Sequence, residues 1–433
     1  MVLTSLRASP PPRVYVYPNA DVAAGSRTLE PVPLRYANGS HVGPNFYLAD
    51  QGMIPLVYRG TKRFATSPHE ADIFLAFMTP YRPPFHEYTD ADRAAIKAFG
   101  PVRHNYMPNA KRLALVRDCE RLFNPNSDFL RSLKYLTKKT ASRHFVISEF
   151  PAGVCGNEPQ FRGRSLTRSV HKLVLELDVD NLHSISQPPF SISMPYPSSI
   201  RWSPHTNRVP PWRRGAVAST APRTFSFVGS ESGQTISVQL RRKTRELCSS
   251  HPRCTSFITG HFPMGLRERG DDPHDSWPAA ADHQERAENM AKALQIKSRS
   301  TFCIEPPGYS PPRKSAVDSM LVGCIPVYFM SSSEFHSYMP FHFRPWGTNA
   351  SVLISPRRFL SGQTDLFATL DAIPPSDVER MQATIASSAH RLVYGLVPFK
   401  DDAVDLLMRG IHTIISYKSK PYFLASARRP WSS

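Results

Sequence analysis

The segment 302–329 constrains the fold of this chain more than any other feature. It reads as an apolar strand, a loop rich in proline and glycine, a short helix, a tight turn and a second apolar strand. Such a unit is typical of a parallel sheet with helices on its faces. The start of the helix offers unpaired N–H groups and a positive dipole end, so the loop before it suits an anionic ligand such as a nucleotide phosphate.

Strands and helices alternate along the rest of the chain. Short apolar and β-branched runs predict strands at 13–17, 73–77, 144–148, 190–194, 224–228 and 255–259. The spacing of apolar residues indicates helices at 126–138, 170–177, 236–248, 282–294 and 399–408, the fourth capped by Asp282. Ser67 and Pro68 predict one helical turn before the strand at 73–77. This alternation predicts an α/β fold.

The segment 203–222 divides the chain into two α/β halves. It is rich in proline, arginine and serine, as interdomain linkers often are. A length of 433 residues also fits two domains. We therefore expect one domain at 13–215 and a second at 222–410.

The chain is strongly basic, with 53 lysines and arginines against 35 aspartates and glutamates and a formal charge of +18. This excess favours anionic partners such as nucleotide diphosphates or acidic polysaccharide, although a basic surface without a specific partner accounts for it equally well. The basic residues are scattered and accompany no nucleic-acid-binding motif. We therefore expect no nucleic-acid partner.

The six cysteines lack the spacing of a zinc site. Cys248 and Cys254 are the best candidates for a disulfide, because they lie close together on either side of a turn that contains proline. Cys303 and Cys324 lie in predicted buried strands, and we interpret them as small core residues.

Neither a metal site nor a membrane span is expected from the sequence. Asp178 and Asp180 have the spacing of a metal-binding pair, but they follow the helix expected at 170–177 and not a strand. No apolar run is long enough to cross a bilayer, and residues 1–12 lack the apolar stretch of a signal peptide. We expect either a soluble protein or one whose anchor lies upstream of this sequence.

An ordered set of segments resembles the exostosin family, glycosyltransferase family 47. The most specific is the segment 302–327, with Phe-Cys-Ile, Pro-Pro-Gly, Ser-Pro-Pro-Arg and Gly-Cys-Ile-Pro-Val in the family's order. Further similar pieces lie at 14–17, 67–74, 143–149, 193–197, 223–229 and 300–303. Each piece is weak alone, but the ordered set is specific and covers roughly residues 13–410.

The resemblance implies an inverting glycosyltransferase with two Rossmann-like domains that face a cleft, the GT-B arrangement. Such enzymes bind a nucleotide-sugar, usually a UDP-sugar, chiefly through the C-terminal domain. Most build polysaccharides in the Golgi lumen and are anchored in its membrane. They neutralise the leaving diphosphate with basic side chains and helix N-termini, so we expect no requirement for a metal or another cofactor.

The resemblance places three donor-binding residues in the signature segment. Asp318 would accept hydrogen bonds from the ribose hydroxyls. Arg313 would bind the diphosphate, because a guanidinium group matches phosphate oxygens bidentately. Gly308 would let the loop backbone approach the nucleotide, and it also suits a turn. The alternative for Asp318 is a helical ion pair with Lys314, four residues earlier.

Two more donor-site candidates lie at the start of the second half. Gly229 follows a predicted strand and would mark the phosphate-facing end of that strand. Arg241 resembles an arginine of the family and would contact phosphate. Arg242 has a nearly equal claim, and a solvated basic helix face is the alternative for both.

The first half supplies a candidate base and a candidate substrate ligand. Glu149 follows a predicted buried strand, where α/β sheets present ligand groups, and an inverting transfer needs a base to deprotonate the acceptor hydroxyl. The family usually carries His-Asp where this chain has Ser148 and Glu149; the alternative is a surface acid or a structural salt bridge. His144 resembles a family histidine and would bind substrate, and the alternative is a buried structural histidine.

These features predict a glycosyltransferase that acts on a nucleotide-sugar donor and a glycan acceptor. An acidic glycan would suit the positive charge. One alternative is a transferase of the same fold with a lipid or small-molecule acceptor. Another is a non-catalytic, glycan-binding or partner-stabilising subunit, since related transferases can pair as homo- or hetero-oligomers.

Overall fold

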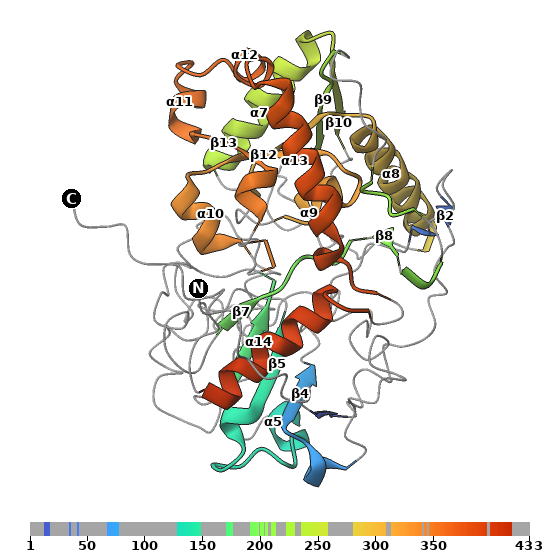
Figure 1. Ribbon diagram of the computed structural model, residues 1–433, viewed down its shortest axis with the longest axis vertical. Coiled ribbons are helices and arrows are strands. Elements are labelled where there is room, and N and C mark those ends of the chain that lie inside the picture. Colours follow the sequence, from blue (N-terminus) through green and yellow to red (C-terminus); the bar gives the residue numbers. More distant parts are fainter. Residues whose placement is uncertain are drawn as a thin grey trace, which may run out of the picture.

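The computed structural model describes residues 13–17, 34–35, 41–42, 67–77, 128–148, 170–175, 191–198, 200–202, 204–206, 209–213, 222–229, 235–258, 280–308, 313–339, 342–343, 346–395 and 399–417. These residues form two lobes stacked along the long axis of the molecule (Figure 1). Each lobe is built around a parallel sheet. The expectation of an α/β fold is therefore confirmed.

The lower lobe of Figure 1 contains five strands that pair in parallel. They lie side by side in chain order: β1 (Val14–Val16), β4 (Ile73–Phe77), β5 (His144–Ser148), β6 (His171–Val174) and β7 (Ser191–Ser193). Most of their described apolar side chains are buried, as expected for strands of a parallel sheet. Three short helical segments lie beside them: η1 (Pro68–Glu70), α5 (Asp128–Ser132) and η2 (Ala141–Arg143).

The upper lobe contains a second parallel sheet, in which the order of the strands reverses. Its strands are β9 (Phe225–Gly229), β10 (Cys254–Ile258), β11 (Phe302–Glu305), β12 (Ile325–Phe329) and β13 (Val352–Ile354). They lie in the order β10-β9-β11-β12-β13, so the chain first builds outward from β9 on one side and then continues on the other. In an open parallel sheet, ligands bind beyond the carboxyl ends of the strands at such a reversal.

Long helices connect the strands of the upper sheet. They are α7 (Thr235–Ser250), α8 (Ala280–Ser298) and α9 (Lys314–Leu321). Because parallel crossovers are right-handed, the reversal places α7 on one face of the sheet and α8 with α9 on the other. In agreement, α8 packs against α9, and α7 packs against α11 (Pro356–Leu360).

The remaining elements complete the upper lobe and its border. They are α10 (Ser332–Tyr338), η7 (Gly347–Ala350), α12 (Leu366–Asp371), α13 (Pro375–Ser388) and η8 (Ala389–Leu392). A small antiparallel sheet joins β2 (Leu34–Arg35), β3 (His41–Val42) and β8 (Ile200–Arg201), and η6 (Pro204–Thr206) follows it. None of the helices in the described part is long and apolar enough to cross a bilayer.

The last helix, α14 (Ala403–Tyr417), returns to the lower lobe (Figure 1). Its apolar residues Val404, Leu407, Met408 and Ile411 recur at helical spacing and are buried with the core of the lower sheet. The chain passes from the lower to the upper lobe between β7 and β8 and returns between η8 and α14. On the return, the hydroxyl of Tyr394 donates to the carbonyl of Pro195, which lies between β7 and β8, at 2.7 Å. The division at 13–215 and 222–410 stays a prediction, although α14 packs on the sheet of the first half.

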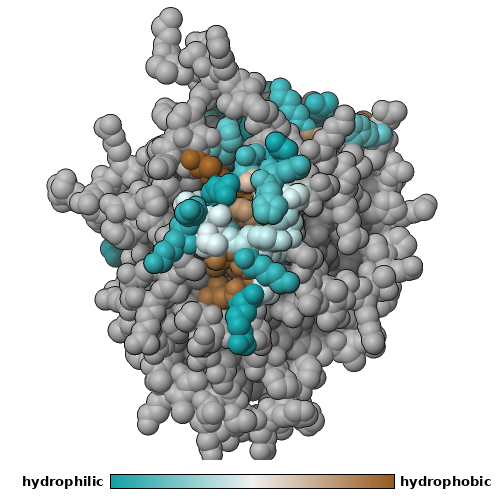
Figure 2. Space-filling model, turned by 90° about the horizontal axis from the view of Figure 1, so that it is seen from below, coloured by the Kyte–Doolittle hydropathy of each residue, from teal (hydrophilic) through white to brown (hydrophobic). Residues whose placement is uncertain are grey.

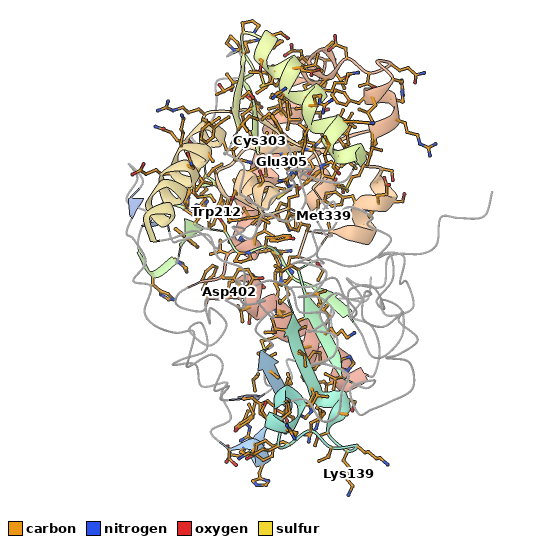
Figure 3. The ribbon with its side chains drawn as sticks, turned by 180° about the vertical axis from the view of Figure 1, so that it is seen from behind. Lys139, Trp212, Cys303, Glu305, Met339 and Asp402 are labelled. Atoms are coloured by element: carbon orange, nitrogen blue, oxygen red, sulfur yellow. A yellow bond between two sulfur atoms is a disulfide. The ribbon has the colours of Figure 1, made fainter. Side chains whose placement is uncertain are left out.

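The end of the lower lobe is polar and basic among its described residues. Figure 2 shows this end from below, where hydrophilic side chains predominate beside smaller pale and apolar patches. Arg131, Lys134, Lys138 and Lys139 are all exposed, and Figure 3 places Lys139 at the lower tip. This part of the positive charge lies far from the reversal in the upper sheet.

Most predicted strands and helices are confirmed, including the turn at 68–70, where the Ser67 hydroxyl accepts from the backbone N–H of His69. The helix expected at 170–177 is wrong, because residues 171–174 form β6, which lies between β5 and β7. A short apolar run within a sheet cannot be distinguished from a buried helix by periodicity. The helix expected at 126–138 shortens to α5, and the one expected at 399–408 begins only at Ala403. Because α8 begins at Ala280, Asp282 lies in its first turn and is not its cap.

Two disulfides lie in the upper lobe. The predicted pair, Cys248 and Cys254, is confirmed, with an S–S distance of 2.13 Å. Our interpretation of Cys303 and Cys324 as separate core residues is wrong, because their sulfur atoms are bonded at 2.04 Å. This bond joins β11 to the turn before β12, so the loop after β11 and all of α9 lie inside a closed ring.

The predicted linker at 203–222 lies partly outside the described residues. In the part that is described, Trp212 is buried in the core of the upper lobe and packs edge-on against Trp202. This part of the linker is therefore anchored to the upper lobe.

Candidate functional site

The reversal brings the ends of β9 and β11 together at the carboxyl edge of the upper sheet. The two strands pair directly, β9 ends at Gly229, and β11 ends at Glu305. In the connection 306–313 that follows, the structure describes 306–308 and Arg313, which form a loop, and α9 begins at Lys314. The segment singled out in the sequence therefore lies where open α/β sheets bind ligands.

Three consecutive carbonyl groups of this loop are held by side chains. Arg313 donates to the carbonyl of Pro306 at 2.8 Å. Arg241 donates through Nε to the carbonyl of Pro307 at 2.9 Å. Ser237, one turn earlier on α7, donates to the carbonyl of Gly308 at 2.7 Å. The first turns of α7 and the start of α9 thus fix the loop from both sides.

The missing side chain of Gly308 leaves space that two guanidinium groups border. A Cβ atom built on Gly308 would lie 3.3 Å from Nη2 of Arg241 and 3.8 Å from Nε and Cζ of Arg313. The first distance is tighter than most real Cβ contacts. The glycine therefore allows the two arginines to converge on the loop backbone, and such paired guanidinium groups suit phosphate oxygens.

Arg241 and its neighbour Arg242 differ sharply in their surroundings. Arg241 is only 1% exposed, whereas Arg242 is exposed. The alternative of a solvated basic helix face is therefore wrong for Arg241 and describes Arg242. Direct contact of Arg241 with phosphate stays a prediction. The contact that the structure shows is its hydrogen bond to the carbonyl of Pro307 in the loop.

Asp318 is buried in α9 with both carboxylate oxygens engaged. Lys314 donates to Oδ2 at 2.6 Å, which is the helical ion pair considered from the sequence. Ser198, from the connection between β7 and β8, donates to Oδ1 at 2.6 Å. The Asp318 side chain is only 6% exposed. A ribose role for Asp318 stays a prediction, and it requires a sugar hydroxyl to join or replace Ser198.

Gly229 lies at the same edge as the loop, at the carboxyl end of β9. A Cβ atom built there would have only the ring of Phe227 within 4 Å, at 3.9 Å. The described surroundings therefore do not require a glycine, and a role in approaching phosphate stays a prediction.

His144 lies at the opposite, amino end of β5 in the lower lobe. Its Nδ1 donates to the carbonyl of Thr140 at 2.8 Å, so its Nε2 accepts from the hydroxyl of Tyr17 at 2.9 Å. The ring is buried and stacks on Phe74 at 4.6 Å between centroids. Burial lowers the pKa of His144 to about 4. These surroundings favour the structural alternative over substrate binding.

The candidate base, Glu149, lies outside the described residues, directly after β5 ends at Ser148. Asp178 and Asp180 also lie outside them. We did not expect this pair to bind a metal because it follows a predicted helix, but residues 171–174 form the strand β6. Among the residues that the structure describes, no group of three or more His, Cys, Asp or Glu side chains could hold a metal ion. That the chain needs no metal stays a prediction.

Sequence reasoning missed the side chains that support the loop from outside the signature. Ser237 gave no signal, because a serine in a helix has many roles. Glu305 carries a weak signal, because it is an acidic residue inside an apolar strand. It is 3% exposed and paired with Lys297 of α8.

Comparison with known proteins agrees with this geometry. The exostosin GT47 domain matches residues 8–360. This chain belongs to the exostosin GT47 family. The matched region contains the whole first sheet, β9 to β13 and the loop with its two arginines.

Several relatives in Arabidopsis thaliana have names of transferases that act on xyloglucan. This chain is 27% identical over 241 residues to the probable xyloglucan galactosyltransferase GT19, an alignment that covers 51% of this chain and 48% of the relative. It is 35% identical to the xyloglucan galactosyltransferase MUR3 over 101 residues, which are 23% of this chain and 16% of the relative. It is 35% identical to the xyloglucan-specific galacturonosyltransferase 1 over 104 residues, 24% of this chain and 15% of the relative.

The chain spans less than half of the length of each of these relatives. Together with the family match, they support the expectation of a glycosyltransferase that acts on a polysaccharide.

Proposed function

We propose that this protein is an inverting glycosyltransferase that moves a sugar from a UDP-sugar to a hydroxyl group of a polysaccharide. The observation that carries the proposal is the convergence of Arg241 and Arg313 on Gly308 at the strand reversal of the upper sheet. A nucleoside diphosphate needs positive charge and close backbone approach, and this loop combines both.

In this proposal, the diphosphate lies over Gly308 at the start of α9. Arg313, which is half-buried, contacts phosphate oxygens directly. Arg241 holds the loop through the carbonyl of Pro307 and adds positive charge from a buried position, where charge is weakly screened. Asp318 receives the ribose hydroxyls in place of the Ser198 hydroxyl, and Gly229 lies beside the phosphates. The arginines and the helix start stabilise the leaving diphosphate, so no metal is needed.

The acceptor lies between the lobes, with the domains 13–215 and 222–410 facing a GT-B cleft. Glu149, directly after β5, removes the proton of the acceptor hydroxyl while that oxygen attacks the anomeric carbon from the face opposite the diphosphate. The relatives suggest a wall polysaccharide such as xyloglucan as acceptor and galactose or galacturonic acid as the sugar. We place the enzyme in the Golgi lumen, with a related transferase as a partner.

Calorimetry with UDP, to measure binding, and a turnover assay with a panel of UDP-sugars test this proposal. Wild-type protein should bind UDP and turn over one donor, UDP-galactose and UDP-galacturonic acid being the first candidates. Binding of UDP without turnover of any donor would instead favour a non-catalytic partner subunit. Glu149→Gln should bind UDP normally and lose turnover, and full activity in that variant would remove the base assignment.

Arg313→Ala should weaken UDP binding by about 10- to 100-fold, the loss of a charged hydrogen bond to phosphate. Gly308→Ala should also weaken it, because the new methyl group meets Nη2 of Arg241. Arg242→Ala is the matched control, since it removes the same charge from the exposed face of α7. Equal UDP affinity in Arg313→Ala and Arg242→Ala would contradict the proposed site.

A further inference from the structure

A buried ion pair lies at the base of the candidate donor loop. Nζ of Lys297, in the last turn of α8, is 2.5 Å from Oε1 of Glu305, the last residue of β11. The two side chains are 3% and 2% exposed. Figure 3 shows Glu305 near Cys303 at the centre of the upper lobe, well inside the protein.

The same ammonium group also reaches the first turns of α9. Nζ of Lys297 is 3.0 Å from the carbonyl oxygen of Ser315, 2.7 Å from its hydroxyl, and 2.8 Å from the hydroxyl of Ser319. Ser319 in turn donates to Oε1 of Glu305 at 2.6 Å. Lys297, Glu305, Ser315 and Ser319 therefore form one buried polar network, which we call the loop clamp.

The loop clamp joins the two ends of the donor loop. Glu305 directly precedes the loop 306–313, and Ser315 lies two residues after it. One ammonium group thus sets the distance between the end of β11 and the start of α9. Gly308 and Arg313 lie between these two points, so their positions depend on that distance.

Stability alone does not explain an ion pair at this place. Removing a lysine and a glutamate from water is costly, and apolar residues of similar volume often stabilise a protein as well or better. A fixed hydrogen-bonding geometry is what the charged pair adds over an apolar pair. Precise geometry matters most where a ligand site depends on it.

We propose that Lys297 and Glu305 are positioning residues that hold the donor loop in the shape that binds a nucleoside diphosphate. This inference rests on the proposed function, and it concerns residues that join the two segments flanking the loop. Loosening the clamp should weaken diphosphate binding even when the fold survives.

The decisive variant replaces both charges with apolar side chains of similar length, Lys297→Met together with Glu305→Met. It leaves no unpaired buried charge, so the melting temperature should stay near that of the wild type. UDP affinity, measured by calorimetry on the same preparation, should fall by about tenfold, the loss expected when one charged hydrogen bond to phosphate is misplaced. Wild-type affinity in a folded double variant would overturn the proposal.

Lys297→Gln together with Glu305→Gln covers the case in which the apolar double variant does not fold, because it keeps hydrogen-bonding groups at both positions and leaves neither buried charge without its partner. It should lower UDP affinity more than a control variant does. That control is Asp371→Asn, which breaks the pair of Arg253 with Asp371 at 2.5 Å in the same lobe, at the amino end of β10. Equal UDP affinity in the double glutamine variant, Asp371→Asn and wild type would also overturn the proposal.

These outcomes are distinct from a failure of the proposed function. If wild-type protein does not bind UDP, the donor site itself is wrong. If wild-type protein binds UDP and Arg313→Ala does not, while the clamp variants bind normally, only the positioning role is wrong.

Discussion

Removal of the disulfide between Cys303 and Cys324 should destabilise the upper lobe more than removal of its companion. The bond spans a sequence separation of 21 residues, and that between Cys248 and Cys254 spans 6. A cross-link stabilises a protein largely by restricting the unfolded chain, and the restriction grows with the logarithm of the ring length. The longer ring is therefore worth about 3 kcal/mol and the shorter about 2 kcal/mol.

The longer ring also contains the donor loop and α9. Because both disulfides lie in the upper lobe, their removal can be compared under matched conditions. The perturbation is Cys303→Ala with Cys324→Ala, and the control is Cys248→Ala with Cys254→Ala. For a lobe of this size, 1 kcal/mol shifts the melting temperature by about 2–4 °C, so the first pair should melt about 6–12 °C lower than wild type. The fall in melting temperature of the control pair should be about two thirds of the fall in the first pair.

Thermal unfolding followed by calorimetry, with urea unfolding as a second measure, checks this difference. A loss below about 1 kcal/mol for the first pair, or a larger loss for the control pair, would refute the reasoning from ring length. Both results can be read without any assumption about the ligand, so they test the fold around the site independently of function.

Two further predictions concern buried polar groups outside the loop. The pKa of His144 in the folded protein is about 4, below its reference value of 6.5. Between these two pH values the unfolded chain binds more protons than the folded protein. The free energy of unfolding therefore falls as the pH drops from about 6.5 towards 4. His144→Gln should therefore flatten this loss in urea midpoints measured at pH 7 and pH 5, and an unchanged slope would contradict the assignment of His144 as buried and neutral. Ser198→Ala should lower the free energy of unfolding by about 1–3 kcal/mol, because Oδ1 of the buried Asp318 loses its donor. An unchanged free energy of unfolding would contradict the hydrogen bond between Ser198 and Asp318.

The sequence predicted the strands of both parallel sheets except β6 and β13, because their apolar runs are short and bounded by proline, glycine or charge. Periodicity failed at 170–177, where a run buried on both faces reads alike as helix or strand. The strand order of the upper sheet, with its reversal at β9 and β11, depends on pairing between distant segments, which no local pattern contains. The return of α14 to the lower lobe was hidden for the same reason.

The candidate site was predicted in its parts but not in its assembly. Gly308 and Arg313 stand in a recognisable segment, so the sequence alone pointed to them. That Arg241 reaches the same loop from α7, 66 residues away from Pro307, follows only from the packing of the fold. The disulfide of Cys303 was missed because an apolar strand already accounts for a buried cysteine. Lys297 was missed because a lysine near a helix end is normally solvated.

Hydrogen–deuterium exchange with and without UDP tests the central claim most directly, because it locates the nucleotide without a substitution. We predict that UDP slows exchange at the amide groups of Gly308 and of the first turn of α9, with little change in the strands of the lower sheet. Protection confined to the lower lobe, or no protection near the loop 306–313 at saturating UDP, would contradict the account.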